Sequence, residues 1–215
     1  VSQTLKLTYE LFLQRSEDVD LSAIFSPEHG LFGREFAAKK CKNEKIRKSI
    51  PVYSLYGDTR RPTSQMLEGI DVLVYDIQDV GTRTYTYATT LFYVMEEAAK
   101  RGIEVWVLDR PNPLGGLIVD GPLLETGTRS FTGYVDVPFC HGMTIGELAQ
   151  YFRGEHCKEC LLKVVKMKGW TRSMFYKDTG LSWVPTSPYI PEADTPLFYA
   201  TTGLIGELSF LSIGI

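Results

Sequence analysis

The strongest constraint on the fold is a regular alternation of strand-like and helix-like patterns along the chain. Short apolar segments that are typical of strands cover residues 20–26, 52–56, 71–77, 103–108 and 161–167. Segments with helical periodicity lie between them, at residues 4–15, 63–67, 86–101 and 144–153. Strands that alternate with helices are typical of α/β domains with a parallel sheet. The alternation therefore predicts an α/β fold with a mostly parallel sheet flanked by helices.

Local signals support individual elements of this prediction. Thr144 and Glu147 have the spacing of a capping box, and Gly102 follows the helix at 86–101 as a stop signal. The continuous apolar run at 71–77 is typical of a strand that is covered on both faces. The proline-rich segment 180–196 is predicted to be an ordered loop.

Length and charge limit the classes of function. The 215 residues are enough for one domain that buries a sizeable core, and the formal net charge is only -3 with the two signs interspersed. The chain therefore lacks the basic surface of a nucleic-acid binder. No apolar run reaches the roughly 20 residues that cross a bilayer. The chain begins at Val1 without a leader pattern and ends in an apolar run, so we expect it to belong to a larger protein.

The four cysteines do not predict a metal site. Cys157 and Cys160 follow His156 at a spacing that metal sites use. A structural zinc site needs about four ligands, and no second spaced pair is present in the sequence. Ordinary thiols or one local disulfide are the expected states, with no metal.

Polar residues follow three of the predicted strands. The carboxyl ends of parallel strands meet at one edge of a sheet, where α/β proteins bind ligands. We therefore expect these loops to form one site. Its candidate residues are Glu28, His29, Asp76, Asp79, Arg83, Tyr85, Asp109, Arg110, Asn112 and, before the helix at residue 144, His141.

Each of these residues also has a purely structural explanation. Glu28 and His29 could be solvated or cap a turn, and Asp109 beside Arg110 could form a structural ion pair. His141 could face the same cleft or be a satisfied structural histidine. The convergence of three such loops favours a functional site, since loops on a rigid scaffold carry function.

Several catalytic motifs are missing from the sequence. It contains no G-x-G-x-x-G after a strand, no Walker loop, no G-x-S-x-G elbow and no H-E-x-x-H. Asp76 and Asp79 resemble the aspartate loop of haloacid-dehalogenase phosphatases, but that family separates its two aspartates by one residue, and here two intervene. A phosphatase-like hydrolase stays as an alternative.

The polar loops resemble those of the exo-β-N-acetylmuramidase family, and the resemblance runs over nearly the whole chain. It rests on several blocks of sequence: residues 25–30 (FSPEHG), 52–57 (VYSLYG), 76–81 (DIQDVG), 108–113 (LDRPNP), 141–144 (HGMT), 167–170 (MKGW) and 183–188 (WVPTSP).

The resemblance implies a Rossmann-like catalytic domain followed by a smaller C-terminal domain, with a cleft between them. It implies release of N-acetylmuramic acid from the non-reducing end of peptidoglycan fragments, without a cofactor, in the periplasm or outside the cell. Glu28 matches the leading catalytic carboxylate. Family members begin before the helix near Thr4 and continue past Ile215. Residues 1–215 are thus expected to be this domain, incomplete at both ends, with the second domain absent or only begun near 196–215.

The mechanism is left open by the sequence. Glycosidases usually place two carboxyl groups about the scissile bond. We expect Glu28 to be the general acid, in a partly apolar pocket around Phe25 and Phe32. Asp76 or Asp79 would be the base or nucleophile, unless the substrate's own acetamido group attacks.

Substrate recognition is predicted from the lactyl carboxylate of muramic acid. A guanidinium suits a carboxylate, so Arg83 and Arg110 are candidates to bind it. Tyr85 and Tyr87 could stack on the sugar or fill the core, and their alternation suggests that only one faces the cleft. A non-catalytic module that binds cell-wall sugars through the same residues is the second alternative. The oligomeric state is open.

Overall fold

The computed structural model describes residues 6–46, 50–125 and 127–206. The helices are α1 (Thr8–Leu13), α2 (Thr86–Ala99), α3 (Ile145–Glu155) and α4 (Thr195–Gly206), with 3-10 turns at Gln65–Leu67 and Tyr176–Thr179. The strands are β1 (Ile24–Ser26), β2 (Glu44–Ile46), β3 (Ile50–Ser54), β4 (Val72–Tyr75), β5 (Glu104–Leu108) and β6 (Leu161–Val165). The predicted α/β class is confirmed.

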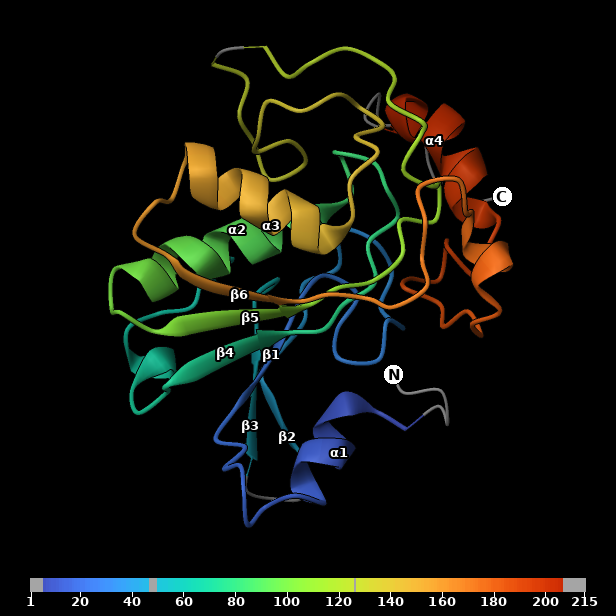
Figure 1. Cartoon of the computed structure of the whole chain (residues 1–215). Helices are drawn as coiled ribbons and strands as arrows, with labels where there is room; N and C mark the ends of the chain where they lie inside the picture. The colour runs from blue at the N-terminus through green and yellow to red at the C-terminus, as the bar shows by residue number, and fades with distance from the viewer. Residues whose placement is uncertain (1–5, 47–49, 126, 207–215) are drawn as a thin grey trace.

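A parallel sheet of order β4-β5-β6 forms the centre of the domain. Figure 1 shows α2 and α3 lying together over one face of this sheet. The capping box predicted for α3 is present, because the Thr144 side chain accepts a hydrogen bond from the backbone N–H of Glu147. The predicted elements at 86–101, 103–108 and 144–153 are thus confirmed within two residues of their ends.

The expectation of one sheet is wrong for the described residues. A second three-stranded sheet has the order β1-β3-β2, in which β1 runs parallel to β3 and β2 runs antiparallel. It crosses steeply behind the first sheet in Figure 1. The polar segment that forms β2 has no strand-like alternation, and its pairing is set by the neighbouring β3. The loop after β1 and the loop after β4 therefore start from different sheets.

The strand β4 is covered on one face only by the described residues. Leu73 and Tyr75 are buried, whereas Val72 and Val74 are 37% and 39% exposed. The prediction of a strand covered on both faces is wrong here because α2 and α3 both pack on the same side. The continuous apolar run at 71–77 correctly predicted a strand, but it did not predict that helices cover only one face of that strand.

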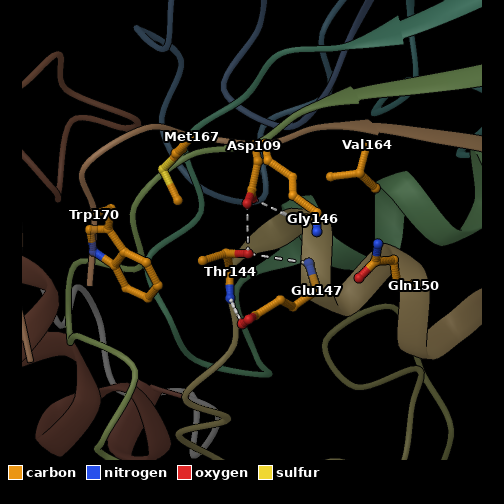
Figure 2. Close-up of a pocket in the computed structure, with 9 residues that line it drawn as sticks. Asp109, Thr144, Gly146, Glu147, Gln150, Val164, Met167 and Trp170 are labelled. Atoms are coloured by element: carbon orange, nitrogen blue, oxygen red, sulfur yellow. Dashed lines mark hydrogen bonds between the residues drawn. The ribbon is translucent and has the colours of Figure 1, made fainter. Parts of the chain in front are cut away.

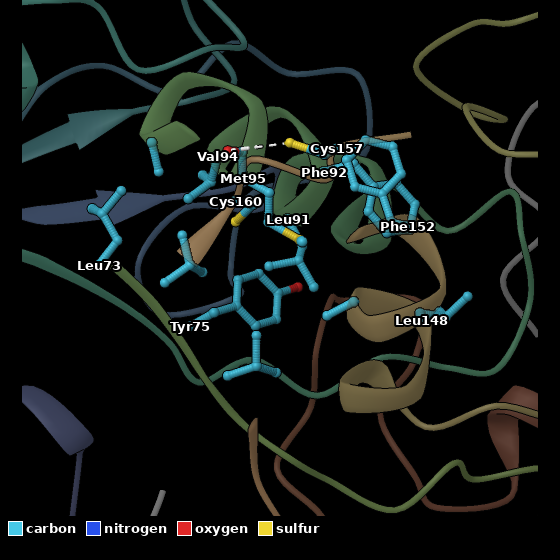
Figure 3. Close-up of a cluster of buried hydrophobic side chains, with 14 of the residues drawn as sticks. Leu73, Tyr75, Leu91, Phe92, Val94, Met95, Leu148, Phe152, Cys157 and Cys160 are labelled. Atoms are coloured by element: carbon cyan, nitrogen blue, oxygen red, sulfur yellow. Dashed lines mark hydrogen bonds between the residues drawn. The ribbon is translucent and has the colours of Figure 1, made fainter. Parts of the chain in front are cut away.

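The core lies between that covered face and the two helices. Phe92 of α2 stacks on Phe152 of α3 with ring centroids 4.4 Å apart. Figure 3 shows Cys157 and Cys160 within the same cluster. All four cysteines are buried free thiols, so the disulfide alternative is wrong. Burial raises the pKa of the Cys160 thiol to about 12, which suits a core residue better than a reactive one.

The remaining expectations concern the two ends of the chain. The predicted helix at 4–15 is present as α1, although residues 1–5 lie outside the described part. The ordered loop at 180–196 is confirmed up to the start of α4, and Trp183 Nε1 donates to the Ile190 carbonyl within it. Residues 207–215 lie outside the described part. None of the described helices is long and apolar enough to span a membrane.

We expect Phe152→Ala to lower the free energy of unfolding by about 3–5 kcal/mol, since it removes a fully buried ring from the core. Urea denaturation measures this change. Phe198→Ala on α4, where the ring is 53% exposed, is the matched control and should stay within about 0.5 kcal/mol of wild type. Similar losses for both variants would contradict the placement of the core.

Candidate active site

The loops after β4 and β5 meet through an ion pair. Arg110 donates from Nε to Asp76 Oδ1 over 2.7 Å, and its Nη2 contacts the same oxygen. The Thr8 hydroxyl at the start of α1 donates to the other Asp76 oxygen. The prediction that Asp76 and Arg110 lie at one edge is confirmed, because two adjacent parallel strands end there.

Hydrogen bonds between side-chain amides and the backbone fix the conformation of these loops. The Gln78 amide donates to the Pro111 carbonyl over 2.8 Å. The Asn112 side chain is buried, and both of its polar atoms make hydrogen bonds. Its Oδ1 accepts from the Leu114 N–H, and its Nδ2 donates to the Met143 carbonyl. Asn112 therefore holds the loop in place, and its amide is not free to bind a ligand.

The catalytic candidate Glu28 lies at the N-terminus of α2. Its carboxylate accepts a hydrogen bond from the Thr86 hydroxyl over 2.8 Å and another from the Ala38 N–H over 3.0 Å. The Tyr87 hydroxyl shares its single proton between the Thr186 carbonyl at 2.6 Å and the Glu28 carbonyl at 3.2 Å. A helix N-terminus favours a negative charge, so this carboxylate is fixed where the helix dipole suits it. Glu28 thus reaches the segment after β4 although it follows the other sheet.

The predicted apolar pocket around Glu28 is not formed as expected. Phe32 is 48% exposed, because its loop turns outward after Gly30. Tyr56 lies next to the carboxylate instead. Burial raises the pKa of Tyr56 to about 12, and the charge of Glu28 adds to this rise. Polar donors and a tyrosine therefore surround Glu28.

His29 is fixed by the same loop. Its φ of 71° lies in the left-handed region, and its Nδ1 is 2.8 Å from the Glu35 carbonyl. This contact requires a proton on Nδ1. The ring lies beside Tyr85 and Tyr87, with centroid distances of 6.4 and 6.2 Å.

The two tyrosines both belong to the core. Tyr85 donates to the Thr186 hydroxyl and Tyr87 to the Thr186 carbonyl, and burial raises the pKa of both. Their rings pack edge to face with centroids 4.8 Å apart. The expectation that one of them faces a cleft is wrong. They begin α2 and do not continue a strand, so the two-residue alternation does not apply.

Asp79 and His141 form a buried pair. His141 Nε2 lies 3.5 Å from Asp79 Oδ2, which also accepts from the Gly81 N–H. His141 Nδ1 accepts from the Met143 N–H over 3.2 Å, so the neutral ring carries its proton on Nε2, toward Asp79. Asp79 Oδ1 has no hydrogen-bond partner among the described residues. His141 is buried beside Asp79, but its Nε2 also has no hydrogen-bond partner among the described residues, so it is not the fully satisfied structural histidine of the second alternative.

Arg83 points away from this group. Its Nη1 donates to the carbonyls of Pro122 and Val137 over 2.8 and 2.5 Å, and burial lowers the pKa of its guanidinium. These contacts tie the loop at 120–137 to the start of α2. Arg83 therefore serves a structural role, but through carbonyl contacts and not through a surface or sheet-end ion pair, which is absent from the described residues.

Asp109 lines a separate cavity of about 210 Å³, drawn in Figure 2. Its carboxylate accepts from the Gly146 N–H, the Thr144 hydroxyl and the Arg110 N–H. Burial raises the pKa of Asp109 despite these hydrogen bonds. Trp170 forms the far wall of this cavity. Glu28 does not line it, so the expected single site divides into a Glu28 side and an Asp109 side.

Four residues of these sites were not among the candidates. Thr86 begins a predicted helix, a position where a hydroxyl often meets a loop carboxylate. Tyr56 and Trp170 lie within blocks that carry the family resemblance, so that signal was available for both. Nothing in the sequence points to Ala38. Among the described residues no group of three or more His, Cys, Asp or Glu side chains could hold a metal ion.

We expect Asp109→Asn to change how stability depends on pH. An acid whose pKa is raised by folding stabilises the protein at low pH, and this contribution is lost as the pH rises through the folded pKa. The wild type should therefore lose stability relative to the variant over a pH range that begins near the ordinary aspartate pKa of about 4 and extends past the raised folded pKa. Urea denaturation of both proteins across this range measures the difference. A difference that stays constant, or that shifts toward the wild type, would contradict the burial of this charge.

The sequence and the fold are similar to those of known proteins. The N-terminal model of the exo-beta-N-acetylmuramidase NamZ family matches residues 1–194. The chain is 47% identical over 206 residues to the peptidoglycan beta-N-acetylmuramidase NamZ of Bacillus subtilis (strain 168), which covers 95% of this chain and 50% of that protein.

Two crystal structures of DUF1343 family proteins from Bacteroides fragilis NCTC 9343 are also similar. The first has a TM-score of 0.89 and 46% identity, covering 100% of this chain and 54% of that one. The second has a TM-score of 0.73 and 32% identity, covering 91% and 51%. The chain thus spans about half the length of the relatives it matches. On the family match and the 47% identity, the chain belongs to the exo-beta-N-acetylmuramidase NamZ family.

Proposed function

We propose that the protein is a glycoside hydrolase that releases N-acetylmuramic acid from the non-reducing end of peptidoglycan fragments, with Glu28 as its catalytic carboxylate. The observation that carries this proposal is the placement of Glu28. It is a buried carboxylate, fixed by Thr86 and Ala38 at the start of α2. A catalytic acid needs such fixed geometry, because proton transfer depends on position before acidity. The relative from Bacillus subtilis supports the reaction and the substrate class.

Glu28 acts on the glycosidic oxygen, and Asp76 is the second carboxylate. Arg110 and Thr8 both donate to Asp76, which orients it at the edge of the sheet. Asp79 is turned toward His141 and the Gly81 backbone and supports the loop. In this assignment Asp76 orients either a water molecule or the acetamido group of the substrate, the two routes open to such enzymes.

Residues 1–194 form the Rossmann-like catalytic domain in this proposal, and a second domain begins near α4. The family model ends at residue 194, and α4 begins at Thr195. The relatives are about twice as long as this chain, which leaves room for a second domain after it. The catalytic cleft would then need both parts.

The two alternatives have less support. A phosphatase-like hydrolase would use Asp76 and Asp79 together, but these carboxylates have separate partners, Arg110 and His141. A non-catalytic sugar-binding module would not need a carboxylate fixed as Glu28 is. Sugar binding without turnover, measured by calorimetry, would favour that module.

We expect Glu28→Gln in the full-length protein to lower kcat on a chromogenic N-acetylmuramic acid glycoside by about 10²–10⁴-fold, the usual contribution of a general acid or base. Glutamine keeps the shape: its oxygen can accept from the Ala38 N–H while its NH2 donates to the Thr86 hydroxyl oxygen, so the fold should persist. Steady-state kinetics measures the loss, and the unfolding midpoint checks the fold.

Glu35→Gln is the matched control on the same loop. Its side chain is 42% exposed and pairs with Lys39, and its contact with His29 is made by the backbone carbonyl. This variant should keep nearly full activity. A Glu28→Gln enzyme that is as active as the Glu35→Gln enzyme would remove Glu28 from catalysis.

A further inference from the structure

Both arginines that were expected to bind a substrate carboxylate are already engaged inside the protein. Arg110 is paired with Asp76, and Arg83 donates to the carbonyls of Pro122 and Val137. The Nε and Nη2 atoms of Arg110 both contact Asp76, and the Nε of Arg83 is buried away from solvent, although it has no hydrogen-bond partner among the described residues. Recognition of a carboxylate near Glu28 therefore calls for another cation.

Arg60 is such a cation. Its guanidinium carbon lies 4.8 Å from the centroid of the Tyr56 ring and 4.1 Å from that of Phe131. The residue is exposed, and within the described part of the chain its guanidinium has no hydrogen-bond or ion-pair partner. The neighbouring Arg61 differs, because it pairs with Glu96. Arg60 is thus held by two rings while its N–H groups remain available.

The position of Arg60 relates it to Glu28 through one shared side chain. Tyr56 follows β3 as Glu28 follows the paired strand β1, with Ser54 opposite Ser26, and the Arg60 guanidinium lies over the Tyr56 ring. The guanidinium and the carboxylate therefore flank the same aromatic side chain. A sugar that binds beside Tyr56 could present groups on different carbons to Glu28 and to Arg60.

We propose that Arg60 binds the carboxylate of the lactyl ether on C3 of N-acetylmuramic acid while Glu28 acts at the glycosidic oxygen on C1. This inference rests on the proposed function. It adds the protein residue that would recognise the lactyl carboxylate, the group that distinguishes muramic acid from N-acetylglucosamine. Stacking on Tyr56 and Phe131 orients the guanidinium plane and leaves its N–H edge for two parallel hydrogen bonds to a carboxylate. Arg60 is a specificity residue in this account and takes no part in proton transfer.

The test compares the free acid with its methyl ester. Binding of N-acetylmuramic acid and of its lactyl methyl ester to the full-length protein is measured by calorimetry, so the result does not depend on turnover. Wild type should bind the acid about 10–100-fold more tightly, the value of a charge-assisted pair of hydrogen bonds. Arg60→Met should remove this preference and leave the affinity for the ester within about twofold.

Two further variants sharpen the comparison. Arg60→Lys keeps the charge but not the planar fork, so an intermediate preference is expected. Arg129→Met is the matched control, because Arg129 is also exposed and lies over an aromatic ring, at 5.9 Å from the Tyr134 centroid. It should keep the wild-type preference. Unfolding midpoints for all variants check that each is folded.

Retention of the acid preference by Arg60→Met would overturn the inference, as would equal binding of acid and ester by wild type. Hydrolysis of the chromogenic N-acetylmuramic acid glycoside is measured in parallel. Lack of hydrolysis by wild type would count against the proposed function alone, since the binding comparison still decides the role of Arg60.

Discussion

The hydrogen bond from the Thr86 hydroxyl to the Glu28 carboxylate is the interaction on which the site depends. Glu28 follows β1 in one sheet, and Thr86 begins the helix that follows β4 in the other. A buried carboxylate is costly unless it is hydrogen-bonded, and here the Thr86 hydroxyl at the start of α2 and the backbone N–H of Ala38 in the loop after β1 meet that need. The contact therefore fixes the catalytic candidate and also links the loop that follows β1 of one sheet to the helix that follows β4 of the other.

The second part of the site has a different physical basis. Asp76 and Arg110 come from adjacent parallel strands, and their ion pair is largely shielded, with side-chain exposures of 9% and 21%. Pairs of this kind add little net stability, because desolvation offsets much of the attraction. Their geometry is specific, since the Arg110 fork and the Thr8 hydroxyl together set the direction of the Asp76 carboxylate. The main effect of these contacts is thus to orient the Asp76 carboxylate, and they add little to the stability of the fold.

The sequence predicted the strands β4 and β5, the helices α2 and α3 and the meeting of Asp76 with Arg110, because these follow from local periodicity and from parallel strand direction. It did not predict that Glu28 starts from a separate sheet, since the pairing of β1 with β3 is a long-range choice that no local pattern reports. The roles of Tyr85, Arg83 and Asn112 were missed for a related reason. Polar atoms on these side chains bind hydroxyls and carbonyls that are distant in sequence, and residue type alone does not reveal such partners.

The central claim is that the sugar binds on the Glu28 side of the domain and not in the cavity between Asp109 and Trp170. A crystal structure of the full-length protein with N-acetylmuramic acid bound tests it most directly. The account predicts the anomeric oxygen within hydrogen-bond distance of Glu28 and the lactyl carboxylate at Arg60. A sugar seated against Asp109 and Trp170, with Glu28 still bonded only to Thr86 and Ala38, would contradict it.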